Sequence, residues 1–377
     1  MKKVFFCAVA LMLGATMFAQ NVNHELQLGI FNSSEVDQIG DDNHSDVTQI
    51  GALNTSDVDQ LGYDNDSDVI QIGLNNDSTV LQDGNDNESD VFQIGADNQS
   101  NVLQDGNDNY SNVNQNGTGN ISDVDQDGNG NDSDVDQDGD GNDSMVSQTG
   151  DDNWSEVTQD GNNNDSDVTQ IGDGNESYVT QDGDDNISEV TQDGDDNYSD
   201  VMQDGNDNES YVTQTGDENE SYVTQIGNDN DSDVTQTGFS NWSDVNQDGN
   251  NNDSEVTQVG AYNWSYVDQD GDGNMSDTDQ YGLGNGSIVI QNDDDNYSHV
   301  LQVGLGNFSY VEQGGVSLFG GNSGENSSHV HQLGAGNISI VRQHELSLFG
   351  TAPGNISVVN QAGLGNFSNV NQVSIGL

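Results

Sequence analysis

The chain has 377 residues, of which 68 are acidic and three are Lys or Arg, so its formal net charge at pH 7 is −65. This charge excludes nucleic acid and anionic membrane surfaces as electrostatic partners and makes cations the expected ones. Hydrophobic residues make up 30% of the sequence, a composition that ordinarily indicates disorder. A fold therefore has to come from a pattern rather than from apolar content.

The first twenty residues have the form of a secretory signal. Lys2 and Lys3 precede an apolar run, and Ala19 stands before a plausible cleavage point. The run of about fifteen residues is too short to span a bilayer, so we expect residues 1–20 to be a signal peptide and the product to be secreted. Cys7 is the one cysteine and lies in this segment, so no disulfide or cysteine-ligated metal is expected.

After this segment a single spacing organises the chain. Glutamine recurs every eleven residues from Gln27 to Gln313, in a unit that reads N-x-S-x-V-x-Q-x-G-x-x. Between Ser34 and Gln313 the Val position gives way once, to Thr278. A unit of this length cannot bury a core alone and must stack on its neighbours. The repeat therefore predicts a stacked array.

Alternation inside the unit predicts the local structure. Asn, Ser, Val and Gln occupy alternate positions, which point to one face of a β-strand. We expect this nearly constant set to face inward, and the Gly and Asp/Asn pairs that follow Gln to form a tight turn. The unit is too short for the crossover helix that an ordinary parallel sheet needs. The predicted fold class is all-β, a β-solenoid of 11-residue strand-turn units.

Aromatic residues indicate two strands in each coil. Tyr178, Tyr222 and Tyr266 are 44 residues apart, as are Tyr110 and Trp154. Coils of three strands would scatter these rings over different sheets, whereas two-strand coils place them on the outward face of one sheet, with a more acidic face opposite. Duplication of a 44-residue segment would leave the same spacing.

The inward Gln and Asn are predicted to form structural ladders. Side-chain amides of identical stacked neighbours can donate to and accept from one another, which satisfies them inside the array. The residues taken to represent these ladders are Gln38, Gln49, Gln60, Gln71, Asn43, Asn54, Asn65 and Asn76.

This pattern resembles the curlin repeats of curli, the bacterial functional amyloid. That family's repeat reads Q-x4-N-x5-Q, with Gly two residues after Gln and a small residue two after Asn. The residues on those places include Gln38, Gly40, Asn43, Ser45 and Gln49. The resemblance runs from Gln27 to Gln372, with Ser where Ala is usual, more repeats and a more acidic surface.

The resemblance implies a secreted, cross-β-like subunit of curli-like fibres, a form of fimbria or pilus, with no enzymatic activity. Such a subunit would form a homopolymer by edge-strand addition, for cell adhesion and biofilm matrix. It also implies a nucleating subunit and an outer-membrane secretion pore as partners. A non-polymerising acidic, cation-binding β-solenoid module of a surface adhesin is the alternative, and ice binding by threonines such as Thr158 and Thr169 is a weaker one.

Site chemistry finds little support in the sequence. No unlike residues are placed once in a way that indicates catalysis. The spacing of acids in a helix-loop-helix calcium site is matched by Asp123, Asp125 and Asp127, but the helical flanks and the final Glu of such a site are missing. We therefore expect no cofactor and no specific metal site, only diffuse calcium or magnesium binding by carboxylate rows. His329 and His331 alternate on one strand and could be metal ligands, but such a pair is more often a surface feature.

The C-terminal part differs from the rest. Only six of the 68 acids lie beyond Leu283, which divides the chain into an acidic solenoid, 21–282, and a less acidic one, 283–377. Two insertions, 314–325 and 344–354, follow units that are two apart, so in a two-strand coil they should leave from one edge and stack. Both contain Ser-Leu-Phe-Gly, and they are either tolerated insertions or docking loops. The candidate docking residues are Leu318, Phe319, Leu348 and Phe349.

Overall fold

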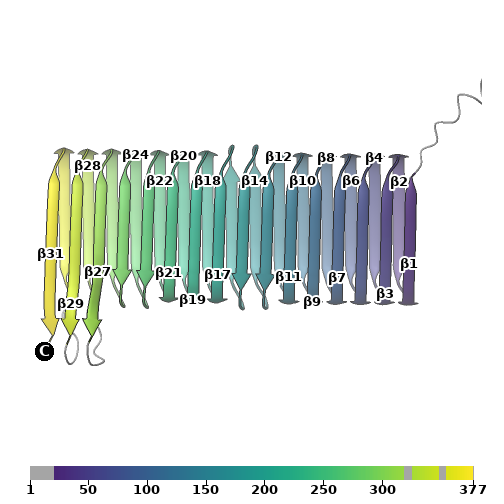
Figure 1. Ribbon diagram of the computed structural model, residues 1–377, viewed down its shortest axis with the longest axis horizontal. Coiled ribbons are helices and arrows are strands. Elements are labelled where there is room, and N and C mark those ends of the chain that lie inside the picture. The colour runs from purple at the N-terminus through teal and green to yellow at the C-terminus, as the bar shows by residue number, and fades with distance from the viewer. Residues whose placement is uncertain (1–20, 318–324, 348–353, 377) are drawn as a thin grey trace, which may run out of the picture.

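The computed structural model describes residues 21–317, 325–347 and 354–376. The predicted signal peptide and the four candidate docking residues lie outside these ranges. The described chain is a straight rod in which strands cross from side to side, with the first strand at one end and the last at the other (Figure 1). Among the described residues every regular element is a β-strand, and no helix is long and apolar enough to cross a membrane.

Two parallel sheets form the rod, and successive strands alternate between them. The odd sheet contains β1 (Val22–Ile30), β3 (His44–Ala52), β5 (Asp66–Leu74), β7 (Glu88–Ala96), β9 (Tyr110–Thr118), β11 (Asp132–Asp140), β13 (Trp154–Asp160), β15 (Glu176–Asp182), β17 (Tyr198–Asn206), β19 (Glu220–Asn228), β21 (Trp242–Asn250), β23 (Trp264–Asp270), β25 (Gly286–Asn292), β27 (Phe308–Ser317), β29 (Ile338–Ser347) and β31 (Phe367–Gly376). The even sheet contains β2 (Ser33–Asp41), β4 (Thr55–Tyr63), β6 (Asp77–Asn85), β8 (Gln99–Asn107), β10 (Ile121–Asn129), β12 (Asp143–Asp151), β14 (Asp165–Ile171), β16 (Ile187–Asp193), β18 (Glu209–Asp217), β20 (Asp231–Phe239), β22 (Asp253–Ala261), β24 (Met275–Leu283), β26 (Tyr297–Leu305), β28 (Ser327–Ala335) and β30 (Ile356–Leu364).

The register confirms two strands per coil. Each strand pairs with the strand two further along, so that equivalent positions stack directly, as Val135 does on Val157 and Gln137 on Gln159. The sheets continue without a break across residue 283, so the acidic and less acidic segments belong to one array. β27 and β29 are neighbours in the odd sheet and are each extended to ten residues, so the first residues of the two insertions, 314–317 and 344–347, pair with one another in the sheet.

The core consists of the constant set of residues, as the alternation predicted. Buried Val side chains form one continuous cluster along the rod, and the Ser, Asn and Gln columns beside it are equally buried. The Ser column differs from the amides, because hydroxyls such as that of Ser133 are buried without a hydrogen-bond partner. The interior is therefore narrow and mostly polar. Its stability depends on whether the buried Asn and Gln amides find hydrogen-bond partners.

The turns explain the Gly, Asp and Asn that follow each Gln. Gly139 has a φ of 130°, and a Cβ built there would overlap the carbonyl oxygen of Gly161 in the next coil, so no other residue fits. Asp152 has a φ of 57°, a conformation that Asp and Asn tolerate better than most residues. Asp151 Oδ1 accepts the backbone N–H of Asn129 at 3.0 Å. Some of the acids thus stabilise the turns rather than serving only as surface charge.

The aromatic residues spaced by 44 lie on one sheet, as predicted. Tyr178 and Tyr222 are on β15 and β19 of the odd sheet, and each packs against Tyr198 between them, with ring centroids 5.7 and 5.3 Å apart. Most outward aromatic residues of the strands lie on this odd sheet, although Tyr211 is on the even one. The expectation of a more acidic opposite face is wrong, because the odd sheet also carries rows of acids that include Asp134.

Candidate functional site: the amide ladders and the rod ends

The inward glutamines form two continuous ladders, one in each sheet. Gln137 Nε2 donates to Gln159 Oε1 at 2.8 Å and to the backbone oxygen of Ile121 at 2.8 Å. Ile121 belongs to β10 of the even sheet, whereas Gln137 is on β11, so the second bond ties the two sheets together. The four predicted ladder glutamines each donate to the Gln 22 residues later at 2.8–2.9 Å, and they are Gln38, Gln49, Gln60 and Gln71.

The asparagines form a second pair of ladders beside the turns. The backbone N–H and Nδ2 of Asn65 both donate to Asn43 Oδ1, at 3.1 and 3.2 Å, and Nδ2 also donates to the carbonyl oxygen of Gly84 at 3.0 Å. Asn76 repeats the backbone contact to Asn54 Oδ1 at 3.1 Å. The ladder therefore fixes the exit of each turn, which is the part of the coil with the least apolar packing.

Backbone partners determine how each amide is oriented. A carbonyl oxygen can only accept, so the Gln nitrogen must face it, and a backbone N–H can only donate, so the Asn oxygen must face it. Every Gln in the ladders consequently directs its Nε2 toward the C-terminal end of the rod, and every Asn directs its Oδ1 the same way. The ladders are polar, and their two ends differ chemically.

The N-terminal end of the rod presents a glutamine acceptor, Gln38 Oε1, which is half-buried and receives no hydrogen bond from a described residue. Gln49 Oε1 also lacks a donor, but it is buried beneath β1, where Gln27 is in register with it. The C-terminal end presents the complementary donors, because Gln361 and Gln372 each use one N–H on a backbone carbonyl, at 2.9 and 2.8 Å, and no Gln among the described residues accepts the other. Strand edges without partners accompany both sets, on β1 and β2 at one end and β30 and β31 at the other.

The first strand departs from the repeat at its core position. Glu25 occupies the Val place of its unit and is paired in register with Val47. It is exposed and accepts a hydrogen bond from Asn23 Nδ2 at 3.0 Å. A coil stacked on β1 would bury this carboxylate, so Glu25 opposes addition at the N-terminal end. Aligning the first unit with the consensus would have revealed it.

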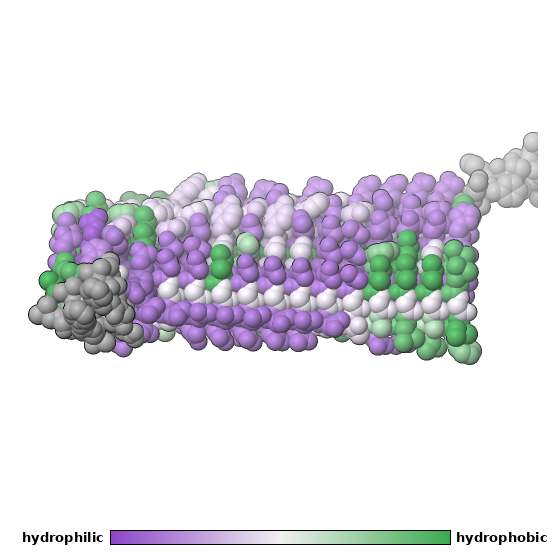
Figure 2. Space-filling view, turned by 60° about the horizontal axis from the view of Figure 1, so that its bottom comes forward, coloured by the Kyte–Doolittle hydropathy of each residue, from purple (hydrophilic) through white to green (hydrophobic). Residues whose placement is uncertain are grey.

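Both ends of the rod carry exposed apolar side chains. Phe31 is 82% exposed next to β1, and Phe367 is 65% exposed on β31. Figure 2 shows apolar side chains gathered over the N-terminal coils, with the middle of the rod predominantly hydrophilic. The acidic middle keeps rods apart in solution, whereas the coils near the ends carry more exposed apolar surface.

Carboxylates along the rod are crowded against one another. Burial, and then neighbouring carboxylates, raise the pKa of Asp90 and of Asp231 to about 6, and burial followed by the charge of Asp134 raises the pKa of Asp132 to about 6. Rows of like charge at the spacing of stacked strands give this response, because little basic charge is present to compensate. The same rows offer oxygen ligands to hard cations such as calcium and magnesium.

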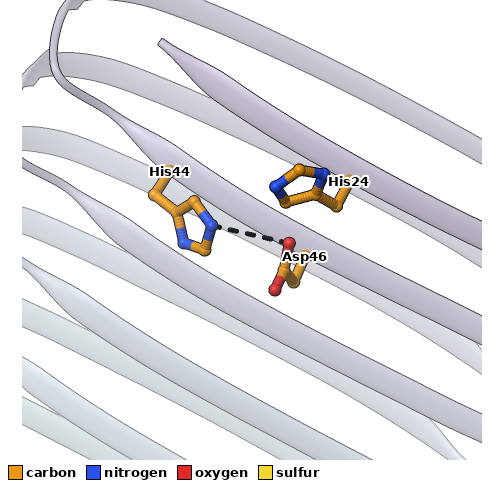
Figure 3. Close-up of side chains that lie close together, drawn as sticks. All are labelled: His24, His44 and Asp46. Atoms are coloured by element: carbon orange, nitrogen blue, oxygen red, sulfur yellow. Dashed lines mark ion pairs between the residues drawn. The ribbon is translucent and has the colours of Figure 1, made fainter. Parts of the chain in front are cut away.

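Histidines near the two ends lie among these carboxylates. At the N-terminal end His24, His44 and Asp46 bring ligand atoms within 4.8 Å of one another, and Figure 3 shows His44 turned toward Asp46. His44 Nε2 is 3.5 Å from Asp46 and its Nδ1 is 2.8 Å from Asp66. The hydrogen bond to Asp66 is the largest cause of a raised pKa at His44. With a carboxylate on each side, this imidazole is suited to hold a proton.

Comparison with known families identifies the repeat. The model of the curlin associated repeat matches residues 106–139, 131–161, 139–172, 161–194, 194–227, 227–260 and 255–282. Residues 106–282 are therefore curlin associated repeats. No curated protein matches its sequence. Curlin-type coils also extend beyond the matched residues, since strands before 106 and after 282 continue the same register and ladders.

Proposed function

We propose that this curlin-repeat protein is a secreted, non-enzymatic subunit of curli-like amyloid fibres, which polymerises by edge-strand addition and serves cell adhesion and biofilm matrix. The observation that carries the proposal is the complementarity of the two rod ends. Glutamine donors and unpaired strand edges lie at one end, and the acceptor Gln38 Oε1 and unpaired edges lie at the other. One rod therefore offers the next a template that repeats its own interior.

Growth by this mechanism is head to tail. The C-terminal coil of one subunit, with Gln361 and Gln372, stacks on the N-terminal coil of the next, where Gln38 Oε1 awaits a donor. Joining two N-terminal ends would place acceptor against acceptor and leave both unsatisfied. The family further suggests a nucleating subunit and an outer-membrane secretion pore as partners.

Electron microscopy of the purified chain from residue 21 onward, together with an amyloid-dye assay, tests polymerisation. We expect unbranched fibres that bind the dye, with strands perpendicular to the fibre axis. A chain that remains monomeric under all growth conditions would support the alternative, a cation-binding module of a surface adhesin. Glu25 is the observation that favours that alternative, because an inward-pointing charge blunts a sheet edge.

Replacing Glu25 by Val is expected to accelerate fibre elongation at neutral pH. The substitution restores the consensus residue and removes the cost of burying a carboxylate under an incoming coil. Elongation from preformed seeds would be followed by dye fluorescence, with Glu35→Val as the matched control, since Glu35 is exposed on β2 at an outward position. Equal acceleration by both variants would show that general charge reduction, rather than the core position, is responsible.

Fibre growth is also expected to depend strongly on salt or divalent cations. At ~0.01 M ionic strength the screening length is ~30 Å, so two acidic rods repel over their full width, whereas at ~1 M it is ~3 Å. Elongation rates would be measured in chelated low-salt buffer, in high salt and in millimolar calcium or magnesium. Rates that are equal in all of these would exclude electrostatic control of assembly.

A further inference from the structure

A second group of histidines lies on the even sheet where the acidic part of the rod ends. Asp277 and Asp279 are on β24, His299 is on the adjacent β26, and His329 and His331 follow on β28. All five occupy outward positions and are half-buried by their neighbours. In the sequence only the pair on β28 stands out, because the other members lie on different strands.

The register brings three potential metal ligands together. His299 is paired directly with Asp277, and its Nε2 lies 3.5 Å from Asp277 Oδ2. One ligand atom from each of Asp277, Asp279 and His299 lies within 4.8 Å of the other two. Donors that share a zinc ion at about 2.0–2.1 Å are separated by roughly 3.4 Å in a tetrahedral site. Small side-chain rotations would close these three residues around one ion.

The other nitrogen of His299 has a partner that fixes the ring. His331 Nε2 lies 3.3 Å from His299 Nδ1. If His299 donates its Nδ1–H to His331, the lone pair of Nε2 faces the two carboxylates, which is the tautomer that a metal ligand requires. In the other tautomer Nε2–H points toward Asp277, and a bound cation would take the place of that proton.

We propose that Asp277, Asp279 and His299 form a binding site for a divalent transition-metal ion of the zinc class, with His331 as a positioning residue. An imidazole nitrogen with two carboxylates suits zinc, whereas calcium and magnesium prefer all-oxygen ligands. The bound ion would join β24 to β26 and so link two successive coils. The site depends on the fold of one chain and not on polymerisation.

His44 provides an internal contrast. Its two ring nitrogens both face carboxylates, at 2.8 and 3.5 Å, so a proton satisfies both sides of the ring. His299 has a carboxylate on one side and another imidazole on the other. His44 is therefore an ion-paired histidine, whereas His299 is the proposed metal ligand. This makes His44 a matched control for substitutions at His299.

Zinc titration of the chelator-treated chain from residue 21 onward tests the site, followed by calorimetry in millimolar calcium that occupies the carboxylate rows. We expect one zinc ion per chain to bind despite the calcium. Binding should weaken at least ten-fold in His299→Gln and in Asp277→Asn, and stay unchanged in His44→Gln. Circular dichroism would establish that each variant keeps its β-structure. Displacement of all zinc by calcium, or an equal loss in His44→Gln, would overturn the proposal.

The role of His331 has its own readout. His331→Ala removes the acceptor for His299 Nδ1 and is expected to weaken zinc binding by about 10–100-fold. His331→Gln offers an amide oxygen that can accept the same bond, so it should recover part of the affinity. Equal affinities for the Ala and Gln variants would show that His331 does not position the ligand.

Discussion

Replacing Gln137 by Ala is expected to destabilise the solenoid by roughly 3–5 kcal/mol, through a buried cavity and lost hydrogen bonds. Gln137 accepts from Gln115 at 2.9 Å and donates to Gln159 and to the Ile121 backbone at 2.8 Å. The substitution therefore leaves one donor and two acceptors unsatisfied in the interior. Because each coil contacts only its neighbours, the damage should begin at this position.

Ser133→Ala on the same strand is the matched control for the ladder. Ser133 is also buried, but its hydroxyl has no partner, so removing it should be neutral or slightly stabilising. Urea unfolding would compare the midpoints, and hydrogen exchange would locate the weakened coils on β11 and its neighbours. A loss of stability in Gln137→Ala no larger than in Ser133→Ala would mean that the amide ladder does not hold the coils together.

The isolated chain is expected to become more stable as the pH falls from about 7.5 to 4.5, with a rise in Tm on the order of 5 °C. Burial raises the pKa of Asp90, Asp132 and Asp231 from 3.8 to about 6. A raised acid pKa means that the folded chain binds protons more tightly than the unfolded chain. The stabilisation is complete below pH 3.8 and is lost as the pH rises through about 6. These side chains are half exposed, so solvent reduces the effect.

A variant in which Asp90, Asp132 and Asp231 are all replaced by Asn should be more stable at pH 7.5 and show a flatter dependence of Tm on pH. Measurements in chelator at constant ionic strength would keep metal binding and screening from contributing. His44 acts in the same direction, because its pKa is raised by Asp66. Acid destabilisation between pH 7.5 and 5, as in proteins whose carboxylates are ion-paired, would contradict this account.

Much of the fold could be predicted from the sequence because one repeat specifies the strands, the turns and the stacking of the coils together. Alternation of Asn, Ser, Val and Gln predicts which face is inward, and the 44-residue spacing of Tyr178 and Tyr222 indicates two strands per coil. The ladders followed, since identical residues in a parallel stack lie one above another. In a chain this polar, only a satisfied periodic interior can offset the entropy of folding.

The tertiary structure alone decided features that depend on neighbours across coils. The polarity of the ladders comes from backbone partners such as Ile121, which lies on the opposite sheet from Gln137. The histidine group depends on the register that β28 adopts after the first insertion, where the Gln spacing becomes 30 instead of 22. A periodic sequence specifies what stacks on what within the repeat. Side-chain direction, and the register beyond an interruption, are set by contacts between strands that the linear pattern does not contain.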